Sequence, residues 1–313
     1  MDNRGARIAF PAALVGAALL LTACGSQRAD TRDDGLTRAQ APSPGLSAGS
    51  LCGPRPSSTT GTAGTAEAEK DGVRITGTDP GRACAEYRIA NHASEPYTYT
   101  ITFTFTSDSG AALRTATETV PAVAAGRTVT RTVTASEDGS GAGRAAGVRI
   151  TKVRSVPTAE AATASGPCPP SGTHVYADDG DAAMGLRVVG LHLRNCGTRP
   201  LRLDGYPRLQ ILDEDHRSPG GVRILHGGSA VATGTGADGP PQTLVLKPGE
   251  YARAELVWRN TVAAGVGDPV NAPYVRVWPK PGATPVTVIP ELDLGTTGRL
   301  AVGPWKKDDT LAR

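Results

Sequence analysis

Residues 97–106 form the stretch that most limits how this chain can fold. The sequence YTYTITFTFT places Tyr, Ile or Phe at every odd position and Thr at every even position. A period of two puts alternate side chains on opposite faces of a β-strand, and aromatic and β-branched residues favour strands. The stretch therefore predicts a strand with one buried face and one solvated face.

Glycine and proline are frequent in the rest of the chain. The 313 residues include 39 Gly and 25 Pro, and uninterrupted helix-forming runs are scarce. This composition predicts an all-β protein. We expect two antiparallel immunoglobulin-like β-sandwiches, over residues 71–156 and 168–305. An Ala/Thr/Ser/Gly-rich linker over 157–167 joins them, and the tail over 306–313 is expected to fray.

The two predicted sandwiches share a layout. Asn91 and Asn195 each follow an alternating segment, and a proline stands five residues after each of them. Later, a turn ending in Gly126 or Gly249 precedes another alternating segment. This repetition predicts two sandwiches of one kind, the second enlarged by the Pro/Gly-rich loop 218–241.

The amino terminus predicts export. Arg4 and Arg7 precede an apolar run over residues 8–21, which suits a signal peptide and is shorter than the roughly 20 residues of a membrane span. Leu-Thr-Ala-Cys over 21–24 resembles the lipobox of bacterial prolipoproteins. The resemblance implies that residues 1–23 are removed and that Cys24 carries acyl chains such as palmitate. An ordinary secretory signal followed by a chance cysteine is the alternative.

The residues after Cys24 predict a tether. Residues 24–70 are rich in Ser, Thr, Gly, Ala and Pro, with few apolar side chains to bury, so we expect a lipidated, disordered segment. With Cys24 lipidated, four of the five cysteines remain, and an oxidising exterior favours disulfides. Four cysteines allow three pairings. We expect the sequential one, because each pair then lies within or beside one sandwich: Cys52 with Cys84, and Cys168 with Cys196.

The second sandwich resembles domain-of-unknown-function family 4232, found on actinobacterial secreted proteins and lipoproteins. The resemblance rests on Asn195, Leu203, Gly205-Tyr206-Pro207, the turn at Asp213–Asp215, Leu246, Pro248-Gly249 and Trp258. This chain departs from the pattern by placing Cys196 directly after Asn195. The family has no established activity, so the resemblance implies fold and location and no catalytic residue.

The charge balance is weak. Thirty-three basic against 30 acidic residues give a net charge of +3, too little to predict a nucleic-acid partner. No nucleophile, base and orienting group can be assembled in a fitting context, so we expect no enzyme and no catalytic residues; a secreted hydrolase is the weaker alternative. The string Gly-Leu-Ser-Ala-Gly over 45–49 lies in the tether rather than in a strand-to-helix turn.

Metal or small-ligand binding is the other alternative. His174, His192, His216 and His226 fall in the second sandwich near several carboxylates, and two His with a carboxylate would suit copper or zinc. No pair has metal-ligand spacing, so we assign no metal ligands and no cofactor. Solvated turns and scattered histidines are the simpler interpretation.

Aromatic side chains are the remaining candidates for recognition. Tyr206, Trp258, Trp278 and Trp305 are expected mainly in the core, with a glycan- or peptide-binding groove as the alternative. Arg259-Asn260 is an exposed polar candidate at a strand end. The sequence predicts a lipoprotein held on the extracytoplasmic face of the membrane by its anchor. We expect a non-enzymatic binding or scaffolding role there, with an unidentified protein or glycan partner.

Overall fold

The computed structural model describes Cys52, residues 68–135 and residues 145–311. The predicted signal peptide, Cys24, the string over 45–49 and most of the tether lie outside the described residues. Both sandwiches belong to one compact unit that spans residues 48–313. Within the described part, no helix is long and apolar enough to cross a membrane.

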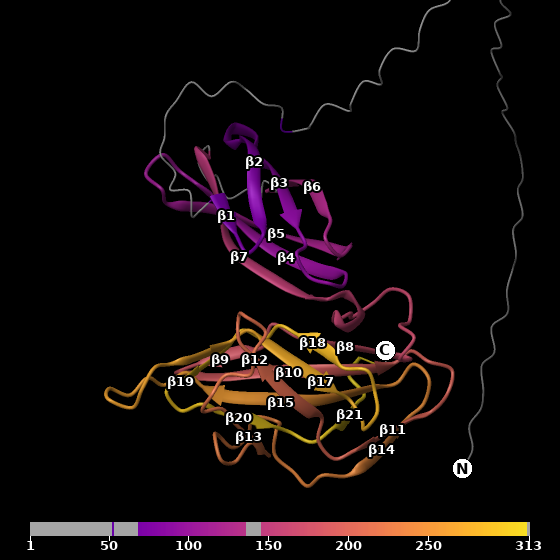
Figure 1. Cartoon of the computed structure of the whole chain (residues 1–313). Coiled ribbons are helices and arrows are strands. Elements are labelled where there is room, and N and C mark those ends of the chain that lie inside the picture. Colours follow the sequence, from indigo (N-terminus) through magenta and orange to yellow (C-terminus); the bar gives the residue numbers. More distant parts are fainter. Residues whose placement is uncertain (1–51, 53–67, 136–144, 312–313) are drawn as a thin grey trace, which may run out of the picture. The chain divides into compact units, whose positions relative to one another are not determined.

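The chain is all-β, and its first sandwich is built from two antiparallel sheets (Figure 1). One sheet has the order β1-β2-β3-β6 and the other the order β5-β4-β7. The strands are β1 (Glu69–Lys70), β2 (Val73–Asp79), β3 (Cys84–Ala90), β4 (Tyr97–Thr106), β5 (Ala112–Val123), β6 (Thr128–Thr134) and β7 (Gly147–Pro157).

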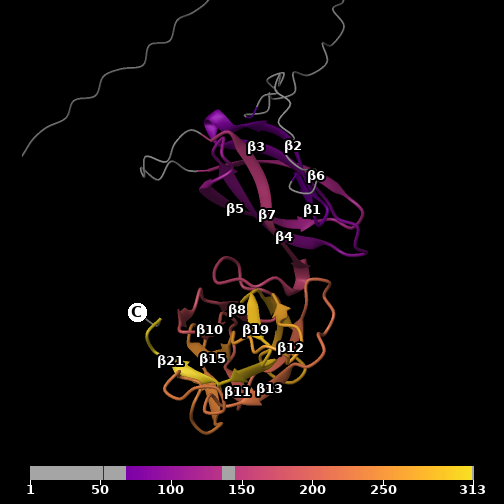
Figure 2. The ribbon, with the colours of Figure 1, turned by 90° about the vertical axis from the view of Figure 1, so that its left-hand side faces the viewer.

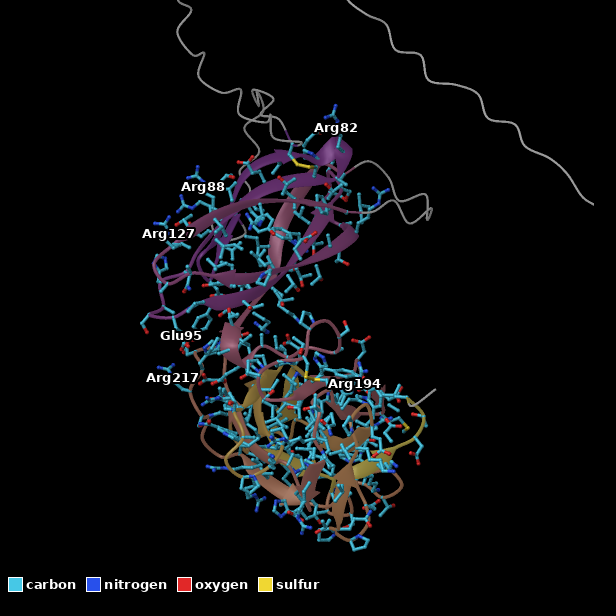
Figure 3. All side chains as sticks on the ribbon, turned by 90° about the vertical axis from the view of Figure 1, so that its right-hand side faces the viewer. Arg82, Arg88, Glu95, Arg127, Arg194 and Arg217 are labelled. Carbon is cyan, nitrogen blue, oxygen red and sulfur yellow. A yellow bond between two sulfur atoms is a disulfide. The ribbon has the colours of Figure 1, made fainter. Side chains whose placement is uncertain are left out.

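Strand β4 confirms the alternation read from the sequence. It has the predicted bounds, and Ile101, Phe103 and Phe105 are fully buried between the two sheets. Its threonine face is not uniformly solvated, because Thr104 and Thr106 are buried as well. The Thr104 hydroxyl is satisfied by a 3.2 Å hydrogen bond to Thr151 on β7. Charged side chains such as Arg88 and Arg127 point outward from this sandwich (Figure 3).

The second sandwich has a seven-stranded sheet that faces shorter ones (Figure 2). The large sheet runs β13-β20-β15-β10-β8, with β9 on β10 and β21 on β15. Its strands are β8 (Thr173–Ala177), β9 (Asp181–Ala183), β10 (Leu186–Asn195), β13 (Arg223–His226), β15 (Tyr251–Arg259), β20 (Arg299–Val302) and β21 (Lys306–Asp308). All pairs are antiparallel except β13 with β20, which are parallel.

The shorter sheets are β12-β17-β18, β11-β14 and β16-β19. Their strands are β11 (Leu201–Asp204), β12 (Arg208–Leu212), β14 (Thr243–Leu246), β16 (Val270–Ala272), β17 (Tyr274–Trp278), β18 (Val286–Val288) and β19 (Leu292–Gly295). Leu191, Leu256 and Trp258 from the large sheet pack with Val275 and Leu294 in one hydrophobic core.

The carboxyl-terminal tail differs from the prediction that residues 306–313 fray. Residues Lys306–Asp308 form β21, paired with Tyr251–Arg253 at the start of β15. The pairing is long-range, and the side chain of Lys306 donates hydrogen bonds to the carbonyls of Gly236 and Asp238, so no local pattern could reveal it.

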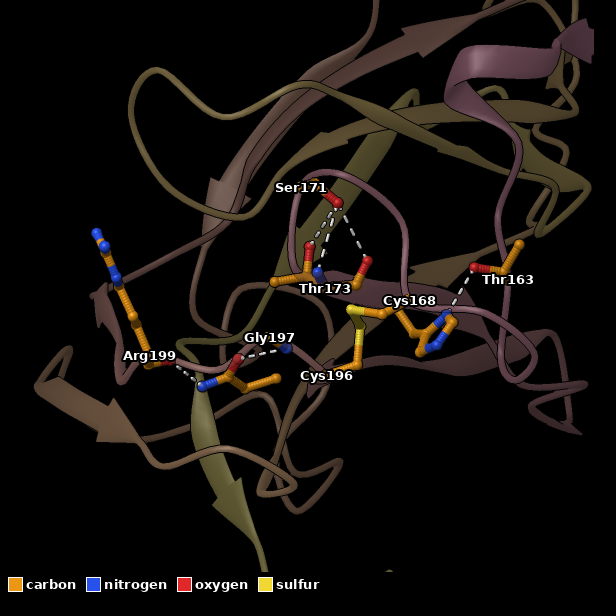
Figure 4. The surroundings of a disulfide bond; sticks show 9 residues. Thr163, Cys168, Ser171, Thr173, Cys196, Gly197 and Arg199 are labelled. Atoms are coloured by element: carbon orange, nitrogen blue, oxygen red, sulfur yellow. Dashed lines mark hydrogen bonds between the residues drawn. A yellow bond between two sulfur atoms is a disulfide. The ribbon is translucent and has the colours of Figure 1, made fainter.

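The two sandwiches contain the same buried asparagine with the same hydrogen bonds. Asn91 donates from its amide to the carbonyls of Glu95 and Val123, at 2.9 and 2.8 Å, and accepts a bond from the Ala93 N–H. Asn195 likewise donates to the carbonyls of Arg199 and Leu246, both at 2.9 Å, and accepts from the Gly197 N–H (Figure 4). The repeated layout predicted from the sequence is therefore present in three dimensions.

The predicted linker is partly ordered by contacts. Residues Thr158–Glu160 form a short 3-10 helix, η2. Glu160 accepts hydrogen bonds from the Arg276 guanidinium, at 2.8 Å from Nε, and from the Thr287 hydroxyl, at 2.9 Å. The backbone of Ala161 forms an isolated parallel bridge with Thr287. The linker thus packs on the outer face of the β12-β17-β18 sheet.

Candidate functional site

A groove of about 510 Å³ opens on the second sandwich, lined by two segments distant in sequence. One segment is the β11–β12 turn, over residues 204–209, and the other is β13, with Ile224 and His226. The turn contains the Gly-Tyr-Pro motif noted in the sequence. A motif read as a fold signature therefore also lines a depression on the surface.

Backbone contacts fix the turn. Gly205 has a φ of +62°, a left-handed conformation that glycine adopts without strain. Its N–H donates to the Gln242 carbonyl at 3.1 Å, and its carbonyl accepts from the Trp305 N–H at 2.8 Å. Trp305 is fully buried. The turn is therefore held to the core, and the next residue, Tyr206, is presented in a defined position.

An aromatic stack forms one wall of the groove. The rings of Tyr206 and His226 lie with centroids 4.3 Å apart and planes 7° apart. Ile224, two residues before His226 on β13, has 39% of its surface exposed. His226 is exposed and Tyr206 is partly buried against the core, so the outer part of the stack and the Ile224 side chain offer apolar contact area.

Arg208 supplies the positive charge of the groove. Its guanidinium lies over the ring of Trp278, 5.0 Å from the centroid, and the guanidinium of Arg276 lies 5.3 Å from the same centroid. Arg276 is paired with Glu160. Among the described residues, no carboxylate forms an ion pair with Arg208, so stacking orients its hydrogen-bond donors without satisfying them.

The carboxylate that lines the groove is already engaged. Asp204 accepts a hydrogen bond from the Thr243 hydroxyl and pairs with Arg202 at 3.0 Å. The bond from Thr243 and the charge and bond of Arg202 lower the pKa of Asp204, so its carboxylate stays ionised. The uncompensated charge of the groove is thus the cation of Arg208.

The four histidines considered as metal ligands are each engaged by different neighbouring groups. His174 is buried, with Nδ1 2.8 Å from the Thr163 hydroxyl (Figure 4), and His226 stacks in the groove. His216 lies against the rings of Tyr97 and Tyr274, and its burial lowers its pKa. In the part of the chain that the structure describes, no group of three or more His, Cys, Asp or Glu could hold a metal ion.

A second polar cluster surrounds His192 on the outer face of the large sheet, a site that sequence patterns did not reveal. His192 Nε2 lies 3.0 Å from Asp178 Oδ2, and Asp178 Oδ1 accepts from the Gly190 N–H at 2.7 Å. Glu255 is buried beside Arg253, and burial raises its pKa while Arg253 opposes the shift. Gly190 makes room for Asp178, because a Cβ there would collide with that carboxylate. The cluster is only partly satisfied, because His192 Nδ1 and Asp308 Oδ2 lie buried 3.7 Å apart without a hydrogen-bond partner among the described residues.

The tryptophans divide between the core and the surface. Trp258 and Trp305 are 2% and 0% exposed and belong to the core, as the simpler interpretation expected, whereas Trp278 is partly exposed beneath Arg208. Asn260 donates to Asp293 at 3.0 Å and so supports the structure. Arg259 remains exposed, with one long hydrogen bond to the Val231 carbonyl.

Both predicted disulfides are present. Cys52 joins Cys84, and Cys168 joins Cys196, with Cα atoms 5.9 and 5.6 Å apart (Figures 3 and 4). Cys196 follows Asn195 directly, so the second bridge ties the segment before β8 to the end of β10. Disulfides persist in oxidising compartments, and this pair fits an extracytoplasmic environment.

Comparison with known proteins supports the resemblance in the second sandwich. Residues 168–306 match the family model described as "Domain of unknown function (DUF4232)". None of the curated proteins matches the chain. Among solved structures, the crystal structure of red sea bream transglutaminase aligns at 10% identity with a TM-score of 0.19. The alignment covers 75% of this chain and 31% of that one, and so low a score carries no argument about fold or activity.

Proposed function

We propose that this chain is an exported lipoprotein, anchored through Cys24, whose second sandwich binds a ligand at the extracytoplasmic face of the membrane without catalysing a reaction. The groove between the β11–β12 turn and β13 is the observation that carries the binding role. The two disulfides and the lipobox-like residues 21–24 support the location.

The lining of the groove favours binding over catalysis. Among its described residues there is no serine, threonine or cysteine to act as a nucleophile. Its carboxylate, Asp204, is held by Thr243 and Arg202, and its histidine, His226, is stacked on Tyr206. Aromatic surface with a few polar groups is typical of ligand pockets. Recognition is therefore the chemistry that these side chains support best.

The anchor is tested by replacing Cys24 with serine and following the protein between membrane and medium. We expect the Cys24→Ser protein to leave the membrane, because no acyl chain can be attached. A Ser26→Ala protein, altered beside the predicted cleavage site, should stay on the membrane as the control. Unchanged membrane retention of Cys24→Ser would refute the anchor.

The binding role is tested with the released Cys24→Ser protein and washed cell envelope. We expect saturable sedimentation with the envelope, and we expect it to weaken at least about tenfold when Tyr206→Ala removes the aromatic platform. Arg223→Ala is the matched control, because Arg223 is an exposed residue of β13 that does not line the groove. Equal binding by the Tyr206→Ala protein would remove the groove from the proposed function.

A further inference from the structure

We propose that the groove recognises an acidic saccharide, with the sugar ring on the Tyr206–His226 stack and the sugar's carboxylate on Arg208. The inference rests on the proposed binding role and names its ligand class. It is drawn from three features of the groove: its uncompensated charge, its aromatic wall and the exposed polar side chains at its rim.

The charge of the groove selects an anion. Of the two arginines over Trp278, Arg276 is neutralised by Glu160, whereas Arg208 forms no ion pair with the described residues. Asp204, the acidic group of the lining, is already paired with Arg202. A guanidinium stacked on an indole ring keeps its N–H donors in a fixed plane, and this orientation suits bidentate binding of a carboxylate.

The aromatic wall selects a ring. Tyr206 and His226 stack face to face, so each ring covers one face of the other. The C–H face of a pyranose can pack on an outer face of this stack while its hydroxyls remain free for hydrogen bonds. Partly exposed Leu209 and exposed Ile224 add aliphatic contact at the side of the platform. The groove of about 510 Å³ is large enough for one or two sugar rings.

The rim favours a saccharide over an apolar peptide. Asp204, Arg208 and His226 are all exposed, and Ile224 is the one aliphatic side chain of the lining with a large exposed fraction. A peptide anchored by a hydrophobic side chain needs a deeper apolar pocket, such as the hot-spot pockets of protein interfaces. Hydroxyl-rich ligands, in contrast, suit a shallow groove with polar ends.

The test uses two probes that share a ring and differ in one carboxylate, methyl glucuronide and methyl glucoside. Each is titrated into the ¹⁵N-labelled Cys24→Ser protein, and amide shifts are followed by NMR. We expect the glucuronide to bind with a dissociation constant on the order of 1 mM, typical of a small ligand, and about tenfold more tightly than the glucoside. Chemical-shift changes should centre on residues 204–209 and 224–226, and added salt should reduce the preference for the glucuronide.

Variants distinguish the contribution of the Arg208 charge from that of the Tyr206–His226 stack. Arg208→Gln should abolish the preference for the glucuronide while leaving the glucoside unaffected, and Arg208→Glu should make the glucuronide the weaker ligand. Tyr206→Ala should weaken both probes, and Arg223→Ala should change neither. Native tryptophan fluorescence confirms that each variant is folded, since all three Trp lie in this sandwich.

Three outcomes overturn the ligand class. These are equal binding of the two probes, a preference that survives Arg208→Gln, or tighter binding of acetyl-tyrosyl-alanine, a peptide with a free carboxylate, than of the glucuronide. If envelope binding depends on Tyr206 but neither sugar shifts the groove, the ligand class fails and the binding role stands. If envelope binding ignores Tyr206→Ala, the binding role fails independently of the sugar titrations.

Discussion

Replacing Asn91 or Asn195 with alanine should destabilise the corresponding sandwich by about 4 kcal/mol. Each asparagine is at most 2% exposed, and each makes three hydrogen bonds with backbone groups. Alanine leaves one fully buried carbonyl unsatisfied, that of Val123 or Leu246, at a cost of about 1–3 kcal/mol, and removes two half-buried bonds worth about 0.5–1.5 kcal/mol each.

The assay can assign each loss to its own sandwich. Trp258, Trp278 and Trp305 all lie in the second sandwich, so tryptophan fluorescence during urea unfolding reports Asn195→Ala. Far-ultraviolet circular dichroism reports both sandwiches and therefore also Asn91→Ala. Asn271→Ala is the matched control, because Asn271 is exposed on β16 and surface substitutions usually change stability by less than about 0.5 kcal/mol.

The shared geometry makes the reasoning refutable. Because the two asparagines have the same donors and acceptors, the two losses should agree within about 1 kcal/mol, the usual scatter of hydrogen-bond contributions. Asn91→Asp should be no better than alanine at neutral pH, since a carboxylate would face two carbonyl oxygens. A loss below about 1 kcal/mol for either alanine variant, or a large loss for only one of them, would contradict the account.

Three further perturbations follow from the structure. Gly190→Ala should lower the free energy of unfolding by about 2 kcal/mol, because the new Cβ would collide with Asp178 and lie 2.9 Å from the Arg253 guanidinium. Gly220→Ala is the control, because its Cβ meets open space and should leave the urea unfolding nearly unchanged. Replacing both Cys168 and Cys196 with serine removes their bridge and should lower stability by about 3.5 kcal/mol, the value of the entropic model for a separation of 28 residues. A loss under about 1 kcal/mol in the fluorescence-detected transition would refute that value. Burial lowers the pKa of His216, so the unfolded chain takes up the proton first and stability should fall as pH drops below about 6.5. Asparagine tolerates the φ of +60° at this position. The urea midpoint of the His216→Asn protein should therefore change less between about pH 7.5 and 5.5 than that of the native chain.

The sequence could predict features that rest on local pattern. The alternation over residues 97–106 gave β4 with its observed bounds, because period-two patterning and β-propensity act within one strand. An asparagine, a proline five residues later and a glycine turn follow one another in the same order from Asn91 to Gly126 and from Asn195 to Gly249. This order predicted a common layout that the hydrogen bonds now explain. The cysteine pairing also followed, because sequential pairing keeps each bridge with one sandwich.

Features that depend on long-range partners escaped prediction. Strand β21 exists because Lys306–Asp308 pairs with the start of β15, far earlier in the chain, so its few polar residues carried no strand signal. Asp178 and His192 are neighbours only because β8 and β10 pair in the folded sheet. The stacking of Arg208 on Trp278 escaped prediction for the same reason, since Trp278 lies on β17. The immunoglobulin-like topology stays a prediction, whereas the all-β antiparallel sandwiches are confirmed.

The two asparagines also show where the sandwiches diverge. The amide of Asn91 reaches a carbonyl 32 residues ahead, whereas that of Asn195 reaches its equivalent 51 residues ahead. The groove residues, over 204–209 and on β13, all lie within that longer connection, and the shorter connection of the first sandwich holds only β4 and β5 as strands. Because the same hydrogen bonds close both connections, the second could lengthen without disturbing the framework. Loops that extend a fixed framework are where binding sites are commonly found, so the proposed ligand should be sought on the second sandwich rather than on the first.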